Sequence, residues 1–267
     1  MTRLTDKNYL QRQYRDASNL NARIALHERF STNPNSWHHW VFEQIDLQPE
    51  SKVLELGCGP AALWVANLDR IPSSWDITLS DLSPGMVEEA RQNLSRSGRE
   101  FAFEVIDAQA IPYSDGSFDA VIANHVLHHV PDVPKALSEI HRVLKPGGHH
   151  YASAVGRGHM GELHELVHEF DAETQIMGTR VFEHFLLDNG TEQIERLFPE
   201  VKLLEHEDSL VVTEAAPLVD YVASMIVSPS YSGERLAQFA RFVEEEIQRR
   251  RAITITKKAG MFVGRRI

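Results

Sequence analysis

The sequence predicts an α/β fold: a doubly wound, mostly parallel seven-stranded sheet with helical lid elements. Three observations point to it. Short apolar strands alternate with helical segments of about ten residues between positions 52 and 154, as in βαβ units. A glycine-rich turn follows the first of these strands. Polar residues follow the next three strands at their carboxyl ends, where open α/β sheets bind ligands.

The alternating elements begin after Pro49 and continue to Ala154. Strands are expected at Lys52–Leu56, Asp76–Ser80, Phe101–Ile106, Phe118–Ala123 and His149–Ala154. Helices are expected at Ala61–Leu68, Pro84–Arg96 and Val133–Val143, the last ending at Pro146-Gly147-Gly148. Right-handed crossovers between parallel strands then place helices on both faces of the sheet.

The alternation is lost after Gly156. Helices are predicted there at Gly161–Glu173, Thr191–Phe198, Pro217–Ser228 and Glu234–Arg251, and strands at Val201–Glu207, Ser209–Thr213, Ile253–Thr256 and Met261–Arg266. Before the first strand, Ser36 is a candidate cap for a helix over Trp37–Ile45. We therefore expect residues 1–45 to form an N-terminal helical lid, 46–156 a Rossmann-like core, and 157–267 a helical cap region with the remaining core strands.

Composition and charge argue against several classes of partner. The chain carries 27 basic and 38 acidic residues, a net charge of −11, whereas proteins that follow a phosphate backbone usually cluster Lys and Arg. We therefore expect no nucleic-acid partner. The single cysteine, Cys58, allows no intrachain disulfide. The polar N-terminus and the lack of an apolar run of about 18 residues predict a cytoplasmic protein with no membrane partner. Oligomeric state stays open.

The polar residues at the strand ends suit a nucleotide-containing cofactor. Gly57-Cys58-Gly59 lets the backbone approach a ligand closely. Asp81, 22 residues after Gly59, can accept both hydroxyls of a ribose. Asp107 and Ala108 follow the third strand, where they can contact an adenine amine, and Asn124-His125 closes the fourth strand. NAD is the nearest rival ligand for a glycine turn followed by an acid.

Between about Lys52 and Tyr151 the chain resembles the class I S-adenosylmethionine (SAM)-dependent methyltransferases, on these residues and on the runs 111–132 and 144–148. The adenine-edge aspartate and the Pro-Gly-Gly turn favour SAM over NAD. One departure is Ala61, where the family often carries a third glycine; alanine is tolerated at a helix start. The resemblance implies that residues 46–156 bind SAM.

The resemblance also implies a role for each residue of the motif. Its cofactor-binding residues are Glu55, Gly57, Cys58 and Gly59 around the methionine part, Asp81 at the ribose, Leu82 and Met86 flanking the adenine, Asp107 and Ala108 at its edge, and Asn124 and His125 closing the pocket. Tyr14, with Tyr9, Arg12 and Arg15, is a candidate to fold over the cofactor from the N-terminal lid.

The reaction implied is in-line displacement at the sulfonium methyl by an oxygen, nitrogen or carbon nucleophile of a small-molecule acceptor. Positioning is the protein's main task. A general base is needed only if the acceptor's pKa exceeds the working pH, and His125, nearest the strand end, is the candidate, ahead of His128 and His129. The cluster 37–40 (Trp-His-His-Trp) is a candidate lining for the acceptor. Acceptor identity and the methylated atom stay open.

One motif belongs to a different reaction class. His164-Glu165-Leu166-Val167-His168 matches the H-E-x-x-H helix of zinc peptidases, with Glu192 as a conceivable third ligand. The chain has 14 histidines, so such pairs arise easily, and a peptidase would leave the glycine and acid motifs without a role. We therefore expect no metal cofactor. A catalytically inert SAM-binding module is the other alternative.

Overall fold

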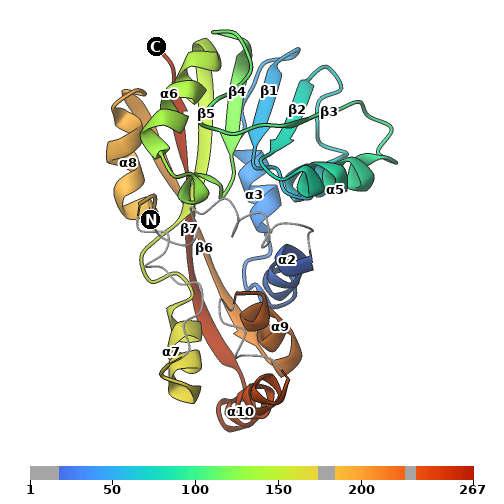
Figure 1. The fold of residues 1–267 in the computed structure, drawn as a ribbon, viewed down its shortest axis with the longest axis vertical. Coiled ribbons are helices and arrows are strands. Elements are labelled where there is room, and N and C mark those ends of the chain that lie inside the picture. Colours follow the sequence, from blue (N-terminus) through green and yellow to red (C-terminus); the bar gives the residue numbers. More distant parts are fainter. Residues whose placement is uncertain (1–17, 174–183, 226–232) are drawn as a thin grey trace.

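The computed structural model describes residues 18–173, 184–225 and 233–267. Seven strands form one sheet in this part of the chain, in the order β3-β2-β1-β4-β5-β7-β6 (Figure 1). The strands are β1 (Lys52–Leu56), β2 (Asp76–Asp81), β3 (Ala102–Val105), β4 (Phe118–Ala123), β5 (Leu144–Val155), β6 (Glu200–Val212) and β7 (Ile253–Arg265). The pairs from β3 to β5 are parallel, and β7 runs antiparallel to both β5 and β6. The predicted mostly parallel seven-stranded sheet is confirmed.

Helices cover both faces of the parallel part of the sheet. α3 (Trp37–Glu43), α4 (Ala62–Val65) and α5 (Pro84–Leu94) pack on one face, and α6 (Val133–Val143) and α8 (Leu187–Glu195) pack on the other. Alternate residues of β1 serve the two cores, since Val53 points into the first and Leu54 into the second. The strand order reverses between β1 and β4, which makes their carboxyl ends the switch point where such sheets bind ligands.

β6 and β7 continue far beyond the parallel strands. They pair from Glu200↔Arg265 to Val212↔Ile253, whereas β5 accompanies β7 only as far as Ala259. The segments 207–212 and 253–258 therefore form a two-stranded ribbon, here called the β6–β7 extension. It runs down from the sheet in the lower half of Figure 1.

Four helices pack around this extension and form what we call the cap. They are α2 (Ser18–Phe30), α7 (Gly161–Phe170), α9 (Ala215–Met225) and α10 (Glu234–Arg250). The cap has its own apolar core, in which Leu210 and Ile255 of the extension lie among helix residues such as Leu26, Leu218 and Phe239. The cap thus joins α2, which precedes β1, to α7, α9 and α10, which lie between β5 and β7 in the chain.

Most predicted elements are present, with shifted ends. Lys52–Leu56, Phe118–Ala123 and Val133–Val143 match, and Ser36 Oγ accepts a hydrogen bond from His39 N as the predicted cap of α3. Other predicted helix bounds differ: Trp37–Ile45 ends at Glu43, Ala61–Leu68 shrinks to Ala62–Val65, Pro84–Arg96 ends at Leu94, Gly161–Glu173 ends at Phe170, Thr191–Phe198 lies at Leu187–Glu195, and Pro217–Ser228 lies at Ala215–Met225, with 226–228 outside the described residues.

The strands differ in one instructive way. The two strands predicted at 201–207 and 209–213 are the single strand β6, and those predicted at 253–256 and 261–266 are the single strand β7. The gaps between the predicted strands contain Asp208 and Lys257, but the two residues are paired with each other across the continuous strands. β5 likewise begins at Leu144, because the Pro-Gly-Gly segment predicted as a helix end already belongs to the strand.

In the part of the chain that the structure describes, no helix is both long and apolar enough to cross a membrane.

Candidate active site

A cavity of about 680 Å³ lies between the carboxyl ends of the parallel strands and the cap. Every sequence-predicted cofactor residue within the described chain lines it: Glu55, Gly57, Cys58, Gly59, Asp81, Leu82, Met86, Asp107, Ala108, Asn124 and His125. Tyr14 lies outside the described residues, as do Tyr9, Arg12 and Arg15. The residues predicted at the ends of four different strands therefore line one cavity.

The turn after β1 requires its glycines. Gly57 has a φ of +68° and Gly59 a φ of +53°, in the left-handed region. A Cβ on Gly57 would lie 2.4 Å from Cγ2 of Val126, so the position excludes any side chain. Ala61, the expected departure from the glycine pattern, also takes a left-handed conformation, with a φ of +63°. Ala61 is the N-cap residue of α4, which begins directly after it.

Asp81 joins the glycine turn to the next helix. One carboxylate oxygen accepts a hydrogen bond from Gly59 N at 3.0 Å, and the other accepts one from Ser83 N at 2.8 Å. Burial raises the pKa of Asp81, and these backbone donors oppose that rise. A carboxylate oxygen can accept two hydrogen bonds, so each retains capacity for a ligand hydroxyl.

Glu55 places a second acid in the cavity wall. It is only 2% exposed, and its carboxylate accepts a 2.6 Å hydrogen bond from the indole N–H of Trp64 on α4. Burial raises the pKa of Glu55 to about 8. A cationic ligand beside it would restore its negative charge.

The loop after β3 contributes the third acid. Asp107 Oδ1 accepts hydrogen bonds from the backbone and the side-chain amide of Gln109, at 3.0 and 2.9 Å. Ala108 and Met86 are buried apolar neighbours in the same wall.

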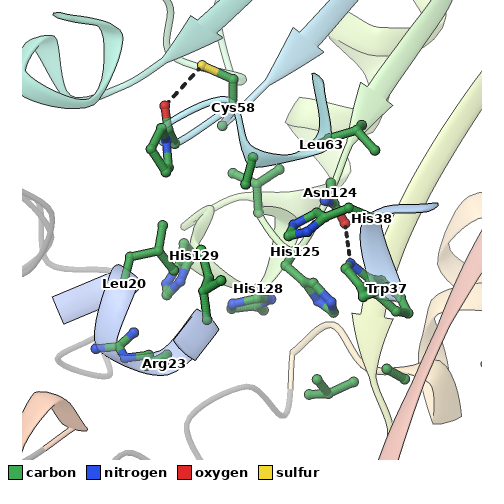
Figure 2. Close-up of a pocket in the computed structure, with 18 of the residues that line it drawn as sticks. Leu20, Arg23, Trp37, His38, Cys58, Leu63, Asn124, His125, His128 and His129 are labelled. Carbon is green, nitrogen blue, oxygen red and sulfur yellow. Dashed lines mark hydrogen bonds between the residues drawn. The ribbon is translucent and has the colours of Figure 1, made fainter. Parts of the chain in front are cut away.

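The end of β4 is fixed by a network of hydrogen bonds. Asn124 Oδ1 accepts from Trp37 Nε1 at 3.3 Å and from Ser153 Oγ at 2.6 Å, while Ser153 Oγ accepts from His125 N at 2.8 Å. The His125 ring stacks on Trp37, with centroids 4.8 Å apart (Figure 2). Burial, and then nearby positive charge, lowers the pKa of His125 to about 3, so the ring is neutral near pH 7.

Only part of the predicted acceptor lining reaches the cavity. Trp37 and His38 line it. His39 instead contacts the carbonyl of Ala66, and Trp40 packs against His206 with ring centroids 5.1 Å apart. His128 and His129 belong to a short 3-10 turn, η2 (Leu127–His129), and also line the cavity.

The cap side of the cavity holds functional candidates that sequence reasoning missed. His27 of α2, His159 before α7, Tyr221 of α9 and Lys257 of β7 all line it. They come from four distant parts of the chain and share no motif, so only the pairing of β6 with β7 and the packing of the cap bring them together. With them, seven histidines line the cavity.

The H-E-x-x-H helix does not build a metal site. His164 lines the cavity, whereas Glu165 and His168 are exposed. Glu192 lies on α8, where it pairs with Arg196 at 2.9 Å. Among the described residues, no group of three His, Cys, Asp or Glu side chains could hold a metal ion.

Comparison with known proteins adds three sequence findings. A family model described as "Methyltransferase domain" matches residues 54–152. Methyltransferase GfsG of Streptomyces halstedii is 30% identical over 204 residues, covering 74% of this chain and 69% of that protein. Demethylmenaquinone methyltransferase of Staphylococcus epidermidis is 37% identical over 112 residues, and the chain spans only 46% of its length.

Two solved structures share the fold. The [4+2]-cyclase SpnF superposes with a TM-score of 0.62 at 19% identity, covering 100% of this chain and 97% of that one. Phosphoethanolamine N-methyltransferase 2 of Haemonchus contortus, solved with SAM, gives 0.59 at 15% identity, covering 97% of this chain and 59% of that one.

Proposed function

The chain belongs to the class I SAM-dependent methyltransferases, and from this premise we propose that it transfers a methyl group from SAM to a small-molecule acceptor held in the cavity. The observation that carries the proposal is the single cavity itself. It brings the strand-end residues of the core together with the side chains of the cap. Cofactor and acceptor would therefore share one enclosed space, the arrangement that positioning two reactants requires.

The residues at the strand ends fit SAM chemically. Gly57 and Gly59 form a backbone turn without side chains in the cavity wall. Glu55, Asp81 and Asp107 supply three acids beside it, which suits a ligand with a sulfonium, an ammonium, a ribose and an adenine. We propose that Glu55 and the glycine turn hold the methionine part, Asp81 the ribose, and Asp107 with Ala108, Leu82 and Met86 the adenine.

The group transferred determines what the protein must do. When bound, SAM supplies a methyl group on a sulfonium, and attack by the acceptor's lone pair forms the new bond to carbon while the carbon–sulfur electrons pass to sulfur, leaving S-adenosylhomocysteine. Asn124 and the stacked pair Trp37–His125 fix the wall where β4 ends. We propose that this wall orients the acceptor and that His125, neutral near pH 7, accepts its proton where one must be removed.

We also propose that the three segments expected from the sequence have separate roles. Residues 46–156 would bind the cofactor, residues 1–45 would contribute the N-terminal lid, and residues 157–267 the cap and remaining strands. The hydrogen bonds of Arg23 on α2 to Ser224 on α9, at 2.8 and 3.1 Å, support joint action of the two flanking segments.

Titration calorimetry with SAM and with S-adenosylhomocysteine tests the proposal. We expect micromolar binding that falls at least about 10-fold in Asp81→Ala, a loss of about 1.4 kcal/mol or more. Glu192→Ala, at an exposed residue of α8, is the matched control and should bind as the wild type does. Failure of the wild type to bind either ligand would refute the proposal. Tight binding without turnover across an acceptor screen would favour an inert SAM-binding module.

A further inference from the structure

Charge is divided between the two sides of the cavity. The acids of its wall all belong to the core: Glu55 lies in β1, Asp81 ends β2, and Asp107 follows β3. The cap side instead contributes Lys257 and Arg23, together with histidines, and its one acid in the wall, Glu28, is exposed. Because the acidic side suits the cationic cofactor, the opposite side suits a ligand of opposite charge.

Lys257 is the buried cation of the cap side. Its side chain is 7% exposed and forms an ion pair with Asp208, directly opposite on β6. Within the described chain, Asp208 is the hydrogen-bond partner that the structure gives to Lys257 Nζ. An ammonium has three N–H groups, so two remain for a ligand in the cavity that Lys257 lines.

His159 is held beside this cation with a fixed tautomer. Its Nδ1 accepts a 3.0 Å hydrogen bond from the backbone N–H of Lys258, the residue after Lys257. Burial, and then the charge of Lys257, lowers the pKa of His159 to about 4, so the ring is neutral near pH 7. A neutral ring that accepts at Nδ1 carries its proton on Nε2. His159 is therefore a hydrogen-bond donor in the cavity wall, not a base.

His27 supplies an independent sign that a ligand belongs here. Its Nδ1 is buried and has no hydrogen-bond partner among the described residues, although buried polar groups normally have one. The positive charge of Lys257 acts on its ring, which lines the same cavity as Lys257 and His159. A ligand between these groups would satisfy it.

We infer that Lys257 and His159 form an anion site that binds a carboxylate-type oxyanion of the methyl acceptor, the ammonium supplying charge and the Nε2–H a directed hydrogen bond. This rests on the proposed function, because it names the class of acceptor that the methyltransferase would take. Charge-assisted hydrogen bonds of this kind are about twice as strong as neutral ones, so the site would discriminate an acid from its uncharged analogue.

Benzoate and benzamide, which match in shape and differ in charge, are suitable probes. Their binding is measured by calorimetry on the protein saturated with S-adenosylhomocysteine and on the free protein. We expect benzoate to bind about 10-fold more tightly than benzamide at pH 7. Equal affinities, or no benzoate binding at millimolar concentration, would overturn the inference.

Two variants assign the preference to the site. Lys257→Met with Asp208→Asn removes both charges, so that neither is left buried alone, and should abolish the preference for benzoate. His159→Phe leaves the ion pair in place and should weaken benzoate several-fold without changing benzamide. A benzoate preference that is undiminished in either variant contradicts the role of the residue replaced. Thermal unfolding of each variant verifies that it is folded.

The cofactor titration separates the two proposals. If S-adenosylhomocysteine binds but benzoate is not preferred, the acceptor class is wrong and the methyltransferase proposal stands. If S-adenosylhomocysteine fails to bind, the proposed function fails, and the benzoate preference of the free protein still decides the anion site.

Discussion

Asp208 and Lys257 face each other across β6 and β7, and their ion pair is almost entirely buried, with side chains 1% and 7% exposed. Asp208 also accepts hydrogen bonds from the backbone N–H groups of Thr32, Asn33 and Ser209, and from Ser31 Oγ at 2.6 Å. Burial alone would raise the pKa of Asp208, but Lys257 and these donors lower it to about 2. One carboxylate thus fastens the segment between α2 and α3 to the β6–β7 extension.

Asp208→Ala should destabilise the protein by about 3–5 kcal/mol, because it leaves the ammonium of Lys257 buried without its partner. The free energy of unfolding from urea titration measures the loss. Glu214→Ala is the control, since it breaks an exposed ion pair with Arg29 and should cost no more than about 1 kcal/mol. Similar losses in the two variants would show that burial of the pair is not what matters.

Gly57→Ala should reduce both stability and SAM affinity, because a Cβ there meets Val126 in addition to the strain of a positive φ. Gly98→Ala is matched in φ, at +70°, but has open space around it, so it isolates the backbone strain of about 1–2 kcal/mol. The excess loss in Gly57→Ala measures the clash by urea titration. Val126→Ala in the same chain should recover part of it, and no recovery would contradict the geometry.

His125, if it is the base, should impose no acidic limb on the rate above about pH 4. Burial, followed by neighbouring charge, lowers its pKa to about 3, so the proton-accepting form persists across the usual assay range. The measurement is the pH profile of kcat/KM for wild type and His125→Gln once an acceptor is known. A wild-type limb near pH 6.5 that disappears in His125→Gln would show that the ring titrates in contact with water.

His150 should make stability depend on pH. Burial lowers its pKa from 6.5 to about 4, although the contact with the Val121 carbonyl opposes the shift. The unfolded chain therefore binds a proton at this residue below pH 6.5 while the folded chain does not, so stability is full above 6.5 and falls as the pH drops toward 4. Each such histidine contributes up to about 1.4 kcal/mol per pH unit.

The free energy of unfolding should fall less steeply between pH 6.5 and 4 in His150→Phe, with a slope smaller by up to about 1.4 kcal/mol per pH unit. Phe198→Leu is the control, because it removes the ring that stacks on His150, 5.3 Å away, and leaves the titrating group in place. It should lower stability at every pH with the slope retained. An unchanged slope in His150→Phe would contradict the assignment.

The sequence was informative where the site is built from residues close together in the chain. The turn at Gly57–Gly59 and Asp107 each follow a strand, and Asp81 ends one. Parallel strands end at one edge of the sheet, so strand order alone brings these residues together. No such rule brings together the residues on the cap side of the cavity. Lys257 meets Asp208, 49 positions away in the chain, only because β6 and β7 are in register there. Charged residues in a strand usually indicate its solvent-exposed face, whereas these two are buried as a pair.

Ala61 shows a smaller limit of the same kind. Its left-handed φ is invisible in the residue type, and because of it the helix predicted to begin at Ala61 begins at Ala62. The H-E-x-x-H helix fails as a metal motif because no third ligand joins it. Glu192 pairs with Arg196 on α8, and among the described residues no group of three His, Cys, Asp or Glu side chains could hold a metal ion.

The separation between sheet and cap has a consequence for how such a protein can change. The family model ends at residue 152, before the cap segments that follow the core, and α2 precedes its first residue. The cap residues His159 and Lys257, which would bind the acceptor's anionic group, are therefore encoded outside the stretch that would hold the cofactor. Exchange of cap helices between relatives, at the β6–β7 extension, would give the same cofactor-binding core a different acceptor.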